Sequence, residues 1–169
     1  VLKDFIDFVK KNPTYNDVLL SIEPSAELIN SDLNSEGWGD YFFQKNQLEK
    51  ANYYYQKAFE ESSQDVNIIK KLADIYLKTK QYKRALEFSF KHLELFPTQI
   101  ELYLIYGKSQ FYLQNWADAI EVMEQGSDYI FEDNNISLEY YELMFDLYNK
   151  NKNSEKAKEI SDMIQLLKS

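Results

Sequence analysis

The chain has 169 residues, which is enough for one domain with a sizeable core, and its 44% hydrophobic and 16% aromatic content excludes the disordered class. Its formal charge of −9 argues against a nucleic-acid or anionic-membrane partner, because both require clustered Lys and Arg. No apolar run approaches the roughly 20 residues that a membrane-spanning helix needs. The absence of Cys excludes disulfides and thiolate sites but is compatible with a reducing or an oxidising compartment.

The first 31 residues have a helical pattern of their own. Residues 1–11 place apolar side chains on one helical face, and Pro13 ends that helix. We predict that residues 1–31 form an N-terminal helical cap or, alternatively, the end of an upstream domain. Because the chain begins with Val1 rather than Met, we expect a trimmed or processed piece of something longer.

An internal repeat organises residues 32–169. Ala51, Ala85, Ala119 and Ala157 follow one another at spacings of 34, 34 and 38 residues. A period near 34 residues is typical of stacked helix pairs. The sequence therefore predicts an all-α solenoid with pairs at 32–65, 66–99, 100–133 and 138–169, and with a short insertion near Asn134–Ser137.

Small residues and helix-capping residues refine this prediction. Gly39, Ala73 and Gly107 are expected where the first helix of a pair crosses the second, since a larger side chain there would force the helices apart. Asp65 is predicted to cap the start of the second pair. Thr98, with Glu101 three residues later, is predicted to form a capping box at the start of the third pair.

These features together resemble the tetratricopeptide repeat family. The resemblance covers Asp32 to Ser169 and rests on the 34-residue period, on Gly or Ala in the first helix, on Tyr or Trp three residues before Ala in the second, and on Pro97 at the end of one unit. It implies a right-handed superhelix. Two residues depart from the pattern: His92 stands where Ala is expected, and Phe145 stands at the small position of the fourth unit, which is therefore expected to splay or to act as a C-terminal cap.

The resemblance also implies a concave groove that is lined by the first helix of each pair. Phe43, Leu77 and Phe111 would form an apolar ladder in it, with Asp40, Asp74 and Asp146 selecting basic side chains; the alternative is that these rings only pack against the next layer. The candidate groove residues are Asp40, Phe43, Lys70, Lys71, Asp74, Leu77, Leu104, Lys108, Phe111, Glu142 and Asp146.

One subclass of partner is excluded by the same resemblance. Family members that clamp the C-terminal carboxylate of chaperones use Lys and Asn at defined groove positions. The matching residues here are Glu36, Asp40, Lys71, Glu101 and Ile105, so acid stands where a cation would be needed. We therefore expect a protein or peptide with apolar anchors and basic residues, and not a chaperone tail.

The predicted function is a non-catalytic scaffold that binds a protein or peptide. Two alternatives stay open: an assembly or oligomerisation segment that self-associates, and a regulatory appendage of a larger multidomain protein. No catalytic residue, cofactor site or metal site is predicted, because the chain has one His, no Cys and no Gly-rich phosphate loop. His92 is expected to be a packed or half-exposed helix residue.

Overall fold

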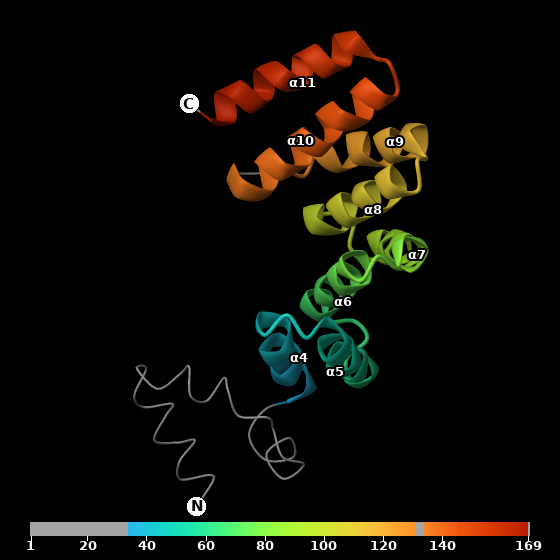
Figure 1. The fold of residues 1–169 in the computed structure, drawn as a ribbon, viewed down its shortest axis with the longest axis vertical. Helices are drawn as coiled ribbons and strands as arrows, with labels where there is room; N and C mark the ends of the chain where they lie inside the picture. The colour runs from blue at the N-terminus through green and yellow to red at the C-terminus, as the bar shows by residue number, and fades with distance from the viewer. Residues whose placement is uncertain (1–33, 131–133, 169) are drawn as a thin grey trace, which may run out of the picture. The chain divides into compact units, whose positions relative to one another are not determined.

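The computed structural model describes residues 34–130 and 134–168, so the predicted N-terminal cap at 1–31 lies outside the described residues. Within these two ranges the chain forms eight helices, α4 to α11, and no strand (Figure 1). The chain divides into two compact units, Val1–Ile68 and Ile69–Ser169. Helix α6 (Val66–Lys78) begins at the end of the first unit and lies mainly in the second.

The described part of the first unit is built around one helix pair, α4 (Ser35–Gln44) and α5 (Leu48–Glu61). The aromatic residues of the sequence fill its interior. Trp38 and Phe42 are buried, and the ring of Phe42 stacks on Tyr54 with 5.3 Å between centroids. Tyr55 lies against Gly39, and its hydroxyl donates a hydrogen bond to Asp40 over 2.7 Å. Aromatic packing therefore holds this pair together.

The second unit continues the pattern with α7 (Tyr82–Leu93), α8 (Ile100–Tyr112), α9 (Trp116–Ser127), α10 (Asn134–Lys150) and α11 (Ser154–Leu167) (Figure 1). Helix α8 packs against α7, α9 and α10, and α10 packs against α8, α9 and α11. Every residue of α8 from Leu102 to Gly107 is buried. This continuous burial means that neighbouring helices cover most of the surface of α8 there, which explains its apolar sequence.

The turn inside each helix pair repeats one backbone geometry. Asn46, Lys80, Gln114 and Lys152 have φ angles of 55°, 60°, 65° and 59°, in the left-handed region. In the second pair the N–H of Lys80 donates to the carbonyl of Leu77 and the N–H of residue 81 donates to the carbonyl of residue 76, over 3.0 and 2.8 Å. These two backbone hydrogen bonds end the first helix of the pair. None of the four residues is Gly, although the left-handed region favours Gly.

The predicted small positions lie where the helices of a pair meet. A Cβ atom added to Gly39 would overlap the ring of Tyr55, and one added to Gly107 would overlap the side chain of Met123. Ala73, at the same position of the second pair, is fully buried. The prediction is therefore confirmed for the two glycines, and a large residue of the second helix occupies the space that each glycine leaves.

One predicted helix cap is confirmed and one is wrong. The carboxylate of Asp65 accepts hydrogen bonds from the N–H groups of Asn67 and Ile68 over 2.8 and 3.4 Å, as an N-cap residue does. At the third pair the N-cap residue is Gln99 instead of Thr98, and no side chain caps the helix. Gln99 is still extended, so α8 begins one residue later than the Thr98 capping box requires.

The insertion predicted near Asn134–Ser137 lies within a helix, because these residues form the first turn of α10. Helix α10 has 17 residues where α8 has 13. Four residues are about one helical turn, so the buried face of the added turn continues the buried face of the rest of the helix. The fourth pair is closed, with Leu147 and Ala157 buried between its helices; Phe145, at its small position, is half-buried.

Candidate functional site

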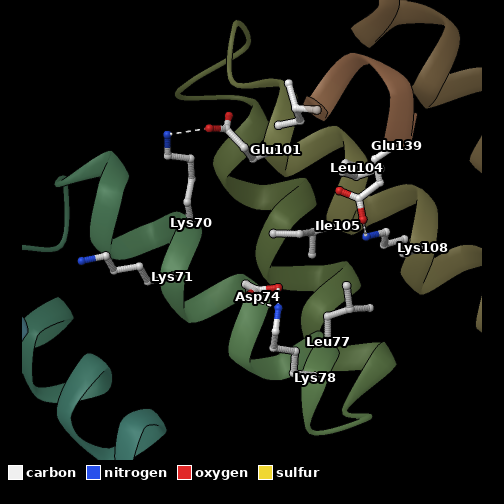
Figure 2. Close-up of a pocket in the computed structure, with 11 residues that line it drawn as sticks. Lys70, Lys71, Asp74, Leu77, Lys78, Glu101, Leu104, Ile105, Lys108 and Glu139 are labelled. Atoms are coloured by element: carbon white, nitrogen blue, oxygen red, sulfur yellow. Dashed lines mark hydrogen bonds and ion pairs between the residues drawn. The ribbon is translucent and has the colours of Figure 1, made fainter. Parts of the chain in front are cut away.

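The second unit contains a groove that crosses the first helices of three successive pairs. Its cavity volume is about 320 Å³, and α6, α8 and α10 contribute all of its lining residues. On α6 these residues recur at intervals of three and four, so that they share one helical face, and the same holds on α8. Figure 2 shows eleven of them: Lys70, Lys71, Asp74, Leu77, Lys78, Glu101, Leu104, Ile105, Lys108, Ile136 and Glu139.

The floor of this groove is aliphatic. Leu104 and Ile105 are buried in α8, at 5% and 6% exposure, and they form its centre. Leu77 from α6 and Ile136 from α10 are half-buried on either side. The four side chains therefore leave apolar surface within reach of a bound segment, and Leu77 and Ile136 are accessible without unfolding the helices.

The rim of the groove consists of paired charges. Lys70 Nζ on α6 lies 2.9 Å from Glu101 Oε1 on α8, as the dashed line in Figure 2 shows. Lys108 on α8 pairs in the same way with Glu139 on α10. Both pairs join residues 31 positions apart, so each links one first helix to the next.

A third pair lies within α6 itself. Lys78 Nζ is 2.8 Å from Asp74 Oδ2, one helical turn away. The carboxylates of the groove are therefore held by its own lysines in all three pairs. This pairing cancels most of the charge at the rim, and the aliphatic floor is the feature that distinguishes the groove from the surrounding surface.

Six of the eleven candidate residues from the sequence line this groove, namely Lys70, Lys71, Asp74, Leu77, Leu104 and Lys108. The other five do not. Glu142 pairs with Lys168, and Asp146 is exposed on α10. Phe111 is half-buried with its ring edge-on to Tyr112, and Asp40 and Phe43 belong to the first unit. Of the predicted ladder, only Leu77 lies in the groove.

Five residues that line the groove are absent from the candidate set drawn from the sequence: Lys78, Glu101, Ile105, Ile136 and Glu139. Glu101 and Ile105 share the face of α8 that carries Leu104 and Lys108, so helical spacing alone could have found them. Ile136 and Glu139 required the knowledge that α10 begins at Asn134. The 34-residue register placed those positions in an insertion or at the first residues of the fourth pair.

The only histidine of the chain is a core residue that does not line the groove. His92 is 3% exposed in α7, its Nδ1 lies 2.7 Å from the carbonyl oxygen of Phe88, and its ring packs against the Phe88 ring with 4.2 Å between centroids. Burial lowers the pKa of His92 below its ordinary value. The neutral ring is therefore favoured, and its position confirms the expectation of a packed residue.

The described residues contain no other grouping that suggests chemistry. In the two described ranges, no cluster of three or more His, Cys, Asp or Glu side chains could hold a metal ion. Among the helices of the same ranges, none combines the length and the apolar character needed to cross a membrane. The groove between the first helices is thus the site that the geometry supports best.

Comparisons with known proteins point to the same architecture. A family model described as anaphase-promoting complex, cyclosome, subunit 3 matches residues 44–126, about half of the chain. No curated protein matches the sequence at a significant level. The three solved structures described next are 16% to 22% identical to this chain, so their likeness concerns the fold.

Three of these structures illustrate the similarity. MamA 41-end from Desulfovibrio magneticus RS-1 is 16% identical with a TM-score of 0.74, over 98% of this chain and 92% of that chain. Another MamA crystal structure is 22% identical with a TM-score of 0.69, over 79% and 71%. A thermophilic TPR protein from Thermus thermophilus is 16% identical with a TM-score of 0.64, over 79% and 73%. The predicted all-α solenoid class is confirmed.

Proposed function

We propose that this chain, which belongs to the tetratricopeptide repeat family, is a non-catalytic protein-interaction scaffold that binds a peptide segment in the groove of α6, α8 and α10. The observation that carries this proposal is the aliphatic floor under a rim of paired charges. An extended or helical segment can place apolar side chains on Leu77, Leu104, Ile105 and Ile136 while its backbone stays near the rim.

The pairing at the rim indicates which part of a ligand supplies affinity. The carboxylate of Asp74 already forms an ion pair with Lys78 over 2.8 Å, so a basic ligand side chain would have to displace that lysine. Exposed ion pairs exchange partners with little net gain, about 0–1 kcal/mol each. Aliphatic anchors on the floor therefore supply most of the affinity, and the rim contributes orientation.

The experiment selects peptides from a random displayed library with the full chain and measures their affinities by isothermal titration calorimetry. Leu77→Ser and Ile136→Ser truncate half-buried floor residues, and each is expected to weaken binding about tenfold. Leu95→Ser is the matched control, because Leu95 is 61% exposed and lies outside the groove lining. The selected peptides should bind the Leu95→Ser variant as tightly as they bind the unaltered chain.

Two outcomes would overturn the proposal. One is a set of selected peptides whose affinities do not change in Leu77→Ser and Ile136→Ser while thermal melts remain those of the unaltered chain. The other is self-association, measured by light scattering, that these same two variants abolish. In that case the groove takes a second copy of the chain, as the assembly alternative requires.

A further inference from the structure

A second groove lies between α9, α10 and α11 and shares no residue with the first. Its cavity volume is about 680 Å³. Helix α10 packs against both α9 and α11, as Figure 1 shows, whereas α9 and α11 are not closely packed on one another in the described part of the chain. The gap between these two second helices is therefore open, with one face of α10 as its floor.

The floor and one wall of this second groove are apolar and adaptable. Tyr141 and Met144 come from α10, and Ile160 and Met163 come from α11. Met163 is 45% exposed, so part of its side chain is accessible at this wall. Methionine side chains are flexible and adjust to different apolar partners, so this surface suits another set of apolar side chains.

The other wall carries negative charge in a fixed arrangement. Glu124 of α9 accepts a hydrogen bond from the hydroxyl of Tyr148 over 2.6 Å, which ties α9 to α10 at the edge of the gap. Burial, together with this hydrogen bond, raises the pKa of Tyr148, so the hydroxyl keeps its proton and remains the donor. The carboxylate of Glu124 is thus held in place at the groove.

Helix α9 carries acidic side chains and no Lys or Arg. The sequence from residue 109 to residue 149 contains nine Asp and Glu residues and no Lys or Arg. On α9, Glu121 stands one turn before Glu124 and is exposed. The cation that lines the second groove is Lys156 of α11; it pairs with Glu159 over 3.0 Å and also interacts electrostatically with Glu124, so one lysine faces the acidic residues of the groove. The potential along the α9 wall is therefore negative.

We propose that this second groove docks a basic amphipathic helix from a partner protein. This helix, about 10–12 Å in diameter with its side chains, would lie on α10 between α9 and α11. Its apolar face, with side chains at intervals of three and four residues, would lie on Tyr141, Met144, Ile160 and Met163. Its Lys and Arg residues would face Glu121 and Glu124, so the charge of the site selects the partner.

The test uses the full chain and two fluorescein-labelled model peptides of about 18 residues, both with Leu at helical spacing. One carries Lys at its polar positions and the other carries Glu. Fluorescence anisotropy should show saturable binding of the Lys peptide, weakened by added salt, and no binding of the Glu peptide. Absence of binding by the Lys peptide, or equal binding by both peptides, overturns the proposal.

Variants then locate the binding surface. Two variants should each lower the affinity for the Lys peptide about fivefold or more. They are Met163→Ser and the double change Glu121→Gln with Glu124→Gln. Gln at 124 can still accept from Tyr148, which protects the fold. The matched control is Glu49→Gln with Glu60→Gln, which removes the same charge from exposed positions on α5. It should leave the affinity unchanged.

Three results with these variants contradict the proposal. An equal loss of affinity in the α9 double variant and in the α5 control double variant would mean that the total charge of the chain, and not the α9 wall, attracts the peptide. Loss of affinity in Leu77→Ser would place the peptide in the first groove. Self-association of the unaltered chain that disappears in Met163→Ser would make a second copy the occupant.

Discussion

At the residue scale, the repeated turn places four non-glycine residues in the left-handed backbone region. Lys80, with φ of 60°, is one of them. Lys80→Gly is expected to stabilise the chain by about 0.5–1 kcal/mol, because the strain of the Cβ disappears while glycine gains some entropy in the unfolded chain. Urea unfolding measures the change. Lys83→Gly, at an exposed position inside α7, is the control and should destabilise. A loss in both variants would contradict the account.

Two buried glycines should respond differently to the same substitution. Replacing a glycine by alanine inside a helix stabilises the folded chain by about 1 kcal/mol through helix propensity, whereas overpacking destabilises it by about 1–3 kcal/mol. At Gly39 the added Cβ meets the flat ring of Tyr55, whereas at Gly107 it meets the flexible side chain of Met123. Gly39→Ala is therefore expected to lower the melting temperature more than Gly107→Ala does. Equal shifts, or a stabilised Gly39→Ala variant, would mean that the ring does not block this position.

His92 gives the chain a predicted pH dependence. Burial lowers its folded pKa below the unfolded value of about 6.5. As the pH falls through that value, the unfolded chain takes up a proton that the folded chain does not bind. The free energy of unfolding should therefore decrease from about pH 7.5 towards pH 5.5 and level off below the folded pKa. Denaturant titrations at several pH values measure this slope.

The control for this pH dependence is His92→Asn. It removes the only imidazole of the chain, so the slope between about pH 5.5 and 7.5 should disappear even if the variant is less stable throughout. A slope that persists unchanged in His92→Asn would assign the pH dependence to other groups.

At the element scale, the two predicted helix caps form a matched pair of tests. Asp65 accepts backbone hydrogen bonds at the start of α6, so Asp65→Ala should cost about 1 kcal/mol of stability. Thr98 precedes the true N-cap residue of α8, so Thr98→Ala should be nearly neutral. Chemical denaturation of both variants distinguishes them. A larger loss of stability in Thr98→Ala than in Asp65→Ala would contradict this prediction and would support the capping box at Thr98.

The same two positions show how far helix ends can be predicted from sequence. Spacing and residue type identified Asp65 correctly, because its side chain is short and directly precedes the apolar pattern. At Thr98 the same rule failed, since the backbone stays extended through Gln99 and the helix begins one residue later. In α10 the four extra residues read as an insertion, yet one added helical turn preserves the buried face.

At the scale of the whole molecule, the repeat period sufficed to predict helix pairs and the all-α class, because each pair must bury the same face against its neighbours. The groove could be predicted only in part. Leu77, Leu104 and Lys108 follow from helical spacing, whereas Ile136 depends on where α10 starts. The ion pairs at the rim depend on how far apart successive first helices lie, and a sequence period does not contain that distance.

The predicted Phe43, Leu77 and Phe111 ladder shows the same limit. Residues 34 apart occupy equivalent places in their own pairs, but the groove collects residues from different turns of successive helices. Lys70 therefore meets Glu101, and Lys108 meets Glu139, at a separation of 31 residues. A neighbouring first helix is thus offset along its axis, which the period alone does not reveal.

The central claim is that the face shared by α6, α8 and α10 binds a peptide segment. The most direct measurement is a two-dimensional ¹H–¹⁵N NMR titration of the full chain with a peptide selected from the random library. The account predicts that the largest amide shifts cluster around Leu77, Ile105 and Ile136 and are lost in Leu77→Ser. Shifts confined to other helices, or unchanged in that variant, would contradict it.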